Sequence, residues 1–392
     1  MDLVACQIDS SLRQLDARVV HCDSDADGCW VVLDDTVLYP EGGGQPCDHG
    51  TIGGVAVDRV ERGADGQVRH RVAAPLPLGP ARVAVDWPRR FDHMQQHSAQ
   101  HLLTAIAATR FGLPTTSFHL HPERCDVELA GEPLAAADLA ALEAAVNQAI
   151  ADDRPVRARV LDPGEPDHAV RSRGLPADHL GPVRVVEIEG LDLNTCGGTH
   201  VARTGLLEAV ALIGSEPLRG GHRLHFLAGG RVRRALHAQL DREAALTRLL
   251  STGPSQHSEA VARLLDDQQQ ARQRERGLLA ELALGLGRQL ARAPGPLLHL
   301  HRDVGDLDFL GAVARAAAAA LPTDAAQPLI LLTAGAAPGE GVFLLVGPPD
   351  RVAACGPQVA AALEGRGGGP KGRYQGRATR LDRLPAALDA LR

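Results

Sequence analysis

The sequence has no C-x-x-C pair, no long uncharged apolar run and almost no lysine. Its seven cysteines are odd in number and scattered, which argues against a disulfide framework and favours a reducing compartment. No stretch reaches the length of an uncharged transmembrane helix, and the N-terminal residues lack the apolar core of a secretory signal. We therefore expect a cytoplasmic protein with no membrane partner.

Acidic residues outnumber basic ones, 48 to 41. The net charge is −7, and Lys371 is the only lysine among 392 residues, so arginine carries nearly all of the basic character. We attribute the preference for arginine over lysine to a habit of the genome rather than to the function of the protein. A nucleic-acid partner would have to be bound by local basic patches, because the chain as a whole does not attract one. The length and the 44% of hydrophobic residues predict two or three domains.

Composition and periodicity divide the chain into four parts with an α+β fold. Residues 1–90 contain short alternating runs bounded by turn residues, which predict a small β-barrel or sandwich. Residues 91–230 begin with a long helical pattern and continue with short strands and a second helix, which predicts a helix packed on an antiparallel sheet. Residues 231–292 have leucines at three- and four-residue steps and predict an antiparallel helical hairpin that forms an arm or linker. Residues 293–392 alternate strand and helix, as in a small α/β domain.

Two pairs of side chains have the same spacing and suit a metal. His97 and His101 lie at positions i and i+4 of the long helical pattern, so both imidazoles leave one face of the helix. Cys196 and His200 are also four apart, across two glycines that allow the chain to bend. Each pair alone is a weak signal. Together they predict one tetrahedral site per chain, with zinc as the usual occupant of a mixed His and Cys site.

The residues around these pairs exclude two kinds of zinc enzyme. A zinc peptidase of the H-E-x-x-H type needs glutamate directly after the first histidine, and this chain has Ser98 there. A zinc deaminase needs H-x-E and C-x-x-C motifs, and neither is present. A purely structural zinc stays open, because four protein ligands leave no coordination position for water.

Three segments resemble the editing domain of alanyl-tRNA synthetase. QQHSAQHLLTA (95–105) and NTCGGTHVARTG (194–205) resemble its paired zinc motifs, and LYPEGGGQPCDHGTI (38–52) resembles the glycine-rich segment that precedes it. The three motifs occur in the same order, and the resemblance covers residues 1–230. Residues 365–380 more loosely resemble the glycine-rich end of the synthetase's C-terminal tRNA-binding domain. Without an aminoacylation domain, the chain is identified as a long free-standing alanyl-tRNA editing protein.

This resemblance implies a zinc-dependent hydrolase that acts in trans on tRNA(Ala) charged with a wrong amino acid, chiefly serine. The resemblance also implies that the four side chains of the predicted metal site, His97, His101, Cys196 and His200, take part in catalysis. It also implies a pocket wall at Gly42, Gly43, Gly44 and Gln45, and polar pocket residues at Thr115, Thr116 and Ser117. As patterns alone, the glycines fit a tight hairpin turn equally well, and the hydroxyl residues are more often turn or cap residues.

Gln100 departs from the family pattern. The synthetase domain commonly has threonine just before the second histidine, and a longer amide there would narrow the pocket. Glycine as a second substrate is therefore in doubt, whereas serine remains favoured. We interpret His93, His119 and His121 as helix-cap or surface histidines rather than as further ligands.

Arginine is concentrated in two segments, residues 219–236 and 366–383. In the second we predict tRNA contacts from Arg366, Lys371, Arg373 and Arg377, and stacking of Tyr374 on a base. The alternative is an ordinary solvated surface. The alternative to the enzyme is a tRNA-binding or synthetase-associated module with a structural zinc and no esterase activity. A homodimer through the helical arm or the C-terminal domain is a further expectation.

Overall fold

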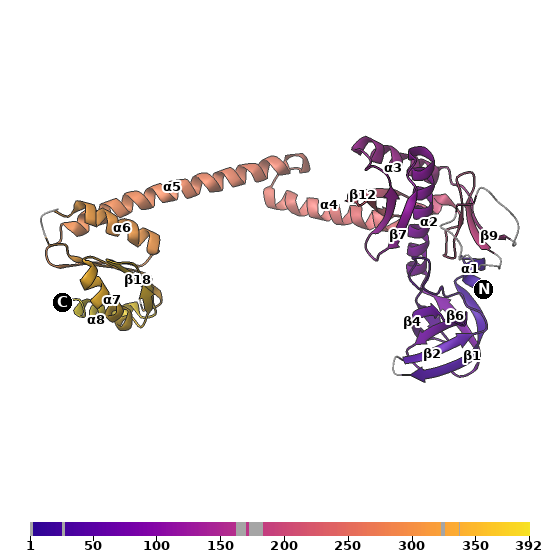
Figure 1. Cartoon of the computed structure of the whole chain (residues 1–392), viewed down its shortest axis with the longest axis horizontal. Helices are drawn as coiled ribbons and strands as arrows, with labels where there is room; N and C mark the ends of the chain where they lie inside the picture. The colour runs from indigo at the N-terminus through magenta and orange to yellow at the C-terminus, as the bar shows by residue number, and fades with distance from the viewer. Residues whose placement is uncertain (1–2, 26–27, 162–169, 172–182, 323–325, 337) are drawn as a thin grey trace. The chain divides into compact units, whose positions relative to one another are not determined.

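The alternating runs of the first 85 residues close into a barrel (Figure 1). In the computed structural model its six strands follow the order β1-β2-β5-β4-β3-β6, and every pairing is antiparallel. The strands are β1 (Gln14–Asp25), β2 (Gly28–Leu33), β3 (Gly50–Ile52), β4 (Val55–Arg62), β5 (Val68–Val72) and β6 (Gly79–Val85). Val31, Ile52, Val60 and Val83 are fully buried inside. The predicted barrel is thus confirmed, and the sandwich alternative is wrong.

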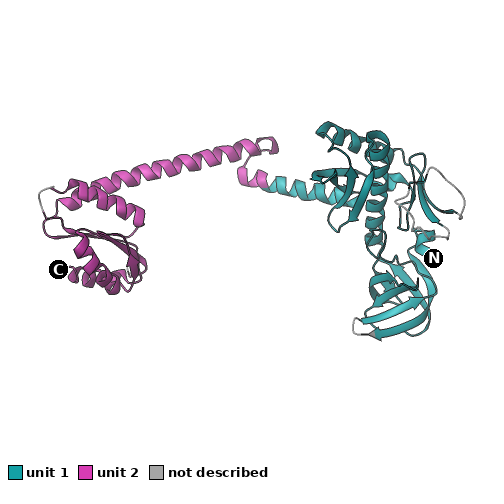
Figure 2. Ribbon diagram, in the orientation of Figure 1, with its two compact units in different colours: residues 1–245 teal, residues 246–392 magenta. Residues whose placement is uncertain are grey.

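The structure describes residues 3–25, 28–161, 170–171, 183–322, 326–336 and 338–392. The chain forms two compact units, Met1–Ala245 and Leu246–Arg392, shown in different colours in Figure 2. None of the helices in these described residues combines the length and the apolar character needed to cross a membrane.

Helix α2 (Trp87–Phe111) follows the barrel directly and is the central element of the first unit. Asp86 caps its N-terminus by accepting a hydrogen bond from the Arg89 backbone N–H, and Gly112 ends it with a left-handed φ of 68°. Ala99, Leu102 and Leu103 are buried, and they belong to a core that α2 shares with an antiparallel sheet. The predicted packing of a helix on an antiparallel sheet is confirmed.

Two sheets and the helices α1 and α3 also belong to the first unit. The four-stranded sheet has the order β12-β13-β8-β7, with β7 (Thr115–Leu120), β8 (Cys125–Ala130), β12 (Val210–Leu218) and β13 (Gly221–Ala228). The three-stranded sheet has the order β11-β10-β9, with β9 (Val156–Leu161), β10 (Val183–Ile188) and β11 (Asp192–Thr195). Helix α1 (Ala5–Ile8) precedes the barrel, and α3 (Ala136–Ala151) follows β8.

Two long helices occupy the region predicted as an arm, α4 (Gly230–Leu250) and α5 (His257–Ala291). They form where the leucine periodicity predicts them, but Leu240, Leu264 and Leu278 are exposed, so these leucine rows do not supply a buried core. The end of α5 differs, because Ala283 and Leu290 are buried in the core of the second unit.

The second unit has an α/β structure, as the alternation of strand and helix in residues 293–392 predicts, and its sheet lies between two layers of helices. Its sheet has the order β14-β15-β16-β18-β17, with β14 (Leu297–Arg302), β15 (Leu329–Ala334), β16 (Gly341–Val346), β17 (Arg366–Gly368) and β18 (Arg373–Ala378). Helix α6 (Leu307–Ala320) and the end of α5 pack on one face. Helices α7 (Pro349–Ala362) and α8 (Leu384–Asp389) pack on the other face.

Candidate metal centre

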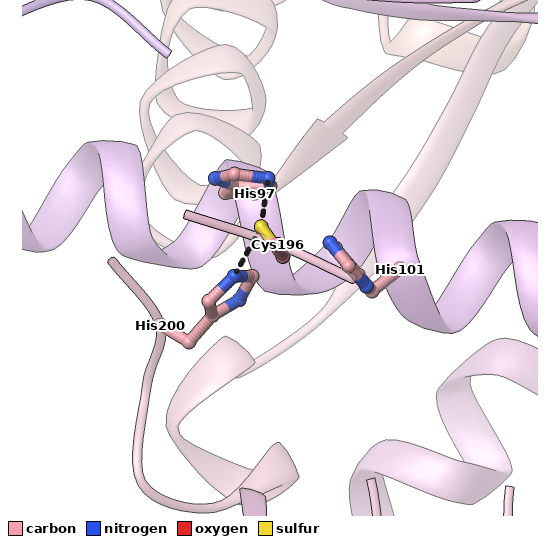
Figure 3. Close-up of side chains that lie close together, drawn as sticks. All are labelled: His97, His101, Cys196 and His200. Carbon is pink, nitrogen blue, oxygen red and sulfur yellow. Dashed lines mark hydrogen bonds between the residues drawn. The ribbon is translucent and has the colours of Figure 1, made fainter. Parts of the chain in front are cut away.

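The two pairs of side chains predicted to bind metal lie together (Figure 3). Helix α2 holds His97 and His101 one turn apart with ring centroids 5.2 Å from each other. The loop after β11 carries Cys196 and His200 across this face of the helix. Gly198 permits the close approach, because a Cβ at this position would lie 2.3 Å from the His97 ring.

The four side chains converge on one point with atoms that suit a metal. The Sγ atom of Cys196 lies 3.4 Å from Nε2 of His97 and 3.2 Å from Nε2 of His200. One ligand atom from each of the four residues lies within 4.8 Å of the others. Three imidazoles and a thiolate form a donor set that zinc accepts in tetrahedral geometry. The residues therefore fit the ion that the sequence predicts.

Each imidazole also has a polar neighbour on its outer nitrogen. Nδ1 of His97 lies 2.9 Å from Oε1 of Gln45, and Nδ1 of His200 lies 3.0 Å from Oγ of Ser98. Such partners fix the tautomer of a histidine and leave Nε2 free for a metal.

The outer partner of His101 is Asp192, whose Oδ2 lies 3.5 Å from Nδ1 of His101. At this distance the two atoms are in ion-pair contact but form no hydrogen bond. Arg171 holds the same carboxylate from the other side, with its Nε 2.6 Å from Oδ1. Two positive or polar groups therefore share the buried charge of Asp192.

The electrostatics of the cluster favour a thiolate. Burial opposes ionisation of Cys196, but His97, His200 and His101 together hold its pKa well below the ordinary value. Burial also works against a charged His101, yet the Cys196 thiolate and Asp192 raise the pKa of His101 to about 9. A metal binds the thiolate form of cysteine, so the charge that it needs is already favoured here.

A cavity borders the metal centre. Its lining includes three of the four proposed ligands and the following neighbours: Gly43, Gln100, Phe118, Asn194, Thr195 and Gly197. Gly43 and Gln100 are thus found where the sequence predicts pocket residues. Gly44 lies against Phe118 with a φ of 82°, and a Cβ there would be 2.9 Å from the Phe118 ring.

The glycine-rich segment is both a tight turn and a cavity edge. Gly42 and Gln45 exchange backbone hydrogen bonds across it, as the turn interpretation expects. Gln45 does not line the cavity. Its Oε1 faces His97 and accepts from the Thr199 N–H, while its Nε2 donates to Thr199 Oγ1 at 2.8 Å. Gln45 therefore ties the turn to both metal-binding segments.

The predicted hydroxyl residues do not line this cavity. Thr115 donates to Thr104 Oγ1, the exposed Thr116 donates to the Glu128 carbonyl, and Ser117 lies 3.5 Å from Nε2 of His119. Sequence reasoning instead missed Phe118, Asn194, Thr195, Ser98 and Asp192. Asn194 and Thr195 directly precede Cys196, so their position in the sequence could have identified them as cavity residues.

Two other interpretations change with the structure. His93 is buried within α2, so it is neither a helix cap nor a surface residue. Tyr374 is half-buried and packs against the core of the second unit, with its ring 6.2 Å from that of Phe343, so the ring is not a fully exposed platform for a base. Lys371 and the cross-strand neighbours Arg366 and Arg377 are exposed, whereas Arg373 is half-buried and bonded to Gln375.

Comparison with known proteins places this centre in a family. Residues 183–224, which include Cys196 and His200, match the threonyl and alanyl tRNA synthetase second additional domain. A rat protein named Alanyl-tRNA editing protein Aarsd1 is 43% identical over 96% of this chain and 94% of its own length. The chain belongs to the alanyl-tRNA editing proteins.

More distant relatives share parts of the chain. The alanyl-tRNA editing protein AlaX-L of Pyrococcus horikoshii is 34% identical over 50% of both chains. An alanine–tRNA ligase of Thermococcus kodakarensis is 29% identical and covers 78% of this chain but 33% of its own length. Family membership agrees with the resemblance seen in the sequence motifs.

Proposed function

We propose that this protein hydrolyses the ester bond of tRNA(Ala) charged with a wrong amino acid, chiefly serine. The observation that carries the proposal is the cavity beside His97, His101 and Cys196 in a chain of the alanyl-tRNA editing family. An aminoacyl ester is already activated. Its hydrolysis requires mainly a positioned water and stabilisation of the developing oxyanion.

In this proposal His97, His101, Cys196 and His200 would hold one zinc ion per chain. A bound zinc can polarise water or a carbonyl group, or it can anchor the substrate. The chain's own residues do the rest. Gln45, Ser98 and Asp192 orient the imidazoles, and Phe118 forms part of the wall of the cavity that the amino acid would enter.

Selectivity for serine follows from the polar part of the lining. Gln100 donates from Nε2 to Thr104 Oγ1, and its buried Oε1 has no hydrogen-bond partner in the described residues. A polar pocket discriminates best against an analogue that lacks the matching group, as alanine lacks the hydroxyl of serine. Glycine, like alanine, has no hydroxyl to offer the Gln100 Oε1, which leaves glycine as the weaker candidate.

Recognition of the tRNA body is assigned to the second unit. Arg366, Lys371 and Arg377 are exposed on or near β17 and β18, where arginine and lysine can contact phosphates. Tyr374 is no longer proposed to stack on a base, because its half-buried ring is packed against the core of the second unit.

The test is to incubate full-length protein with tRNA(Ala) charged with serine, glycine or alanine. We expect fast release of serine, slower release of glycine and almost none of alanine. Cys196→Ala should lose both zinc, measured by elemental mass spectrometry, and deacylation. Gln100→Leu should keep its zinc and narrow the ratio of serine to alanine rates several-fold, since one neutral hydrogen bond contributes about 0.5–1.5 kcal/mol. A zinc-loaded protein that binds tRNA but releases no amino acid would instead support the binding module.

A further inference from the structure

A second group of metal-binding side chains lies at the turn between β7 and β8. His119 is in β7, His121 directly follows β7, and Asp126 is in β8. The strand register pairs His119 with Asp126 across the hairpin. Phe118 and Leu120 alternate with the two histidines, so they project from the opposite face. That face packs on the core beneath the metal centre, where the Phe118 and His97 rings are 5.4 Å apart.

The three side chains converge on the Asp126 carboxylate. Nδ1 of His119 lies 2.9 Å from Oδ1, and Nε2 of His121 lies 3.5 Å from Oδ2. The two imidazole rings are roughly parallel, at 23° and 5.8 Å between centroids. One ligand atom from each residue lies within 4.8 Å of the other two. Among the described residues, only this group and the four-residue centre bring three or more such side chains this close.

The burial of Asp126 distinguishes this group from an ordinary ion pair on the surface. The Asp126 side chain is 4% exposed, and a buried carboxylate needs compensating charge. Arg223 provides part of it, with Nε 3.4 Å from Oδ1, but its Nη2 is paired with Glu128. Oδ2 therefore faces His121 and stays available. The histidine side chains are 44% and 60% exposed, so solvent and ions reach the group.

We propose that His119, His121 and Asp126 bind a second divalent metal ion of the zinc class. Two imidazoles and a carboxylate are zinc ligands, and three protein ligands leave one tetrahedral position for water. The site should bind more weakly than the four-ligand centre, because it has one ligand fewer and lies beside the Arg223 cation. A bound ion would clamp the β7–β8 turn, whose other face carries Phe118. The site is independent of the proposed deacylase activity.

Cobalt distinguishes the two sites because only the first contains a thiolate. Tag-free, metal-free, full-length protein would be titrated with Co²⁺ while absorbance and bound metal are measured. The thiolate-to-cobalt charge-transfer band should saturate with the first equivalent. A second equivalent should then add ligand-field absorbance without any further charge transfer. Saturation at one equivalent would overturn the proposal.

Single substitutions assign the second equivalent to its residues. His121→Gln and His119→Gln should each reduce the total to about one cobalt per chain while the charge-transfer band is unchanged. The matched control is His21→Gln. His21 is an exposed histidine 2.6 Å from Asp23, but among the described residues this pair belongs to no group of three or more metal-binding side chains. This control should retain two equivalents. Loss of the second equivalent in His21→Gln, or its retention in both site variants, would contradict the assignment.

Discussion

At the scale of single residues, the side chains that contact the outer nitrogens of the proposed metal ligands should have a large effect on metal affinity. Gln45 contacts His97 on one segment and Thr199 on the other through three hydrogen bonds. Gln45→Leu should weaken zinc affinity about 10–100-fold, the usual effect of losing such a partner. Competition with a zinc chelator measures this loss. The exposed Gln67, changed to leucine, is the control and should leave the affinity unchanged.

His70 makes the barrel sensitive to acid. Burial lowers its pKa to about 4, and its ring contacts Thr36 Oγ1 and the Val31 carbonyl. In the unfolded chain the pKa of histidine is about 6.5. Between these two values the unfolded chain binds a proton that the folded barrel does not, so stability falls as the pH falls. The slope is at most about 1.4 kcal/mol per pH unit.

Urea unfolding at several pH values tests this contribution. His70→Gln should unfold with a shallower pH dependence than the unsubstituted chain between pH 6.5 and 4. His21→Gln, which changes a histidine whose side chain is 61% exposed, should keep the original dependence. Identical slopes for all three proteins would remove His70 as the cause.

At the scale of elements, α2 joins the barrel to the metal centre. A buried ion pair connects the two parts. Arg90 lies near the start of α2, and Asp48 lies in the segment that precedes β3. Arg90 Nε donates to Asp48 Oδ2 at 2.8 Å, and Arg90 Nη1 donates to the Ser10 carbonyl. Both side chains have no exposed surface. A buried cation without its partner is strongly unfavourable.

Asp48→Ala should therefore lower the free energy of unfolding by about 3–5 kcal/mol. The control is Asp58→Ala, which breaks the pair with Arg71 on the barrel surface and should cost less than about 1 kcal/mol. Chemical denaturation measures both values. Similar small losses in the two variants would mean that Arg90 finds another partner.

Sequence periodicity predicted where helices and strands form better than it predicted the direction in which their side chains point. The i, i+4 pair in α2 and the four-residue spacing in the loop predicted the group of side chains that the structure brings together, namely His97, His101, Cys196 and His200. The pocket assignment of Thr116 and Ser117 failed to match the lining because it treated neighbours in β7 as equivalent. Successive strand residues face opposite sides, which separates Ser117 from Phe118, the residue of this segment that lines the cavity. A register shift beside Thr116 further alters the direction of its neighbours.

The contacts of Asp192 and Tyr374 could not be predicted from the spacing of residues in the sequence. Asp192 lies close to His101 because β11, which pairs with β10, also contacts α2. The Tyr374 ring faces inward because Gly356 of α7 leaves space for it, and a Cβ there would lie 2.4 Å from the ring. Both positions depend on contacts between segments that are distant in the sequence.

At the scale of the whole molecule, the boundary between the units falls within α4, at Ala245. The start of α4 belongs to the first unit. Arg231 is buried, its Nη2 lies 2.6 Å from Asp92 Oδ2, and the Gly230 N–H donates to Gln95. A chain that ends at Gly230 would lose the arginine and leave Asp92 without this partner.

A fragment that ends at Ala245 should fold, bind one zinc at the four-ligand centre and hydrolyse seryl-tRNA(Ala) at saturating protein. It should need more protein than the full chain, because Arg366, Lys371 and Arg377 are absent. Each lost phosphate contact should also reduce the salt dependence of tRNA binding by about one unit of slope. Filter binding across a salt series measures both. Equal affinity and slope would exclude a tRNA-binding role for the second unit.

The separation of the two ligand pairs along the chain links metal binding to folding. His101 and Cys196 enclose residues 102–195, so an ion held by both pairs closes a long loop as a cross-link does. In the unfolded chain either pair alone supplies only two ligands, and closing a loop of this length costs entropy. The ion would therefore favour the native chain over the unfolded one. Chelation should lower the unfolding midpoint of this segment, and unfolding should release the ion in the same transition.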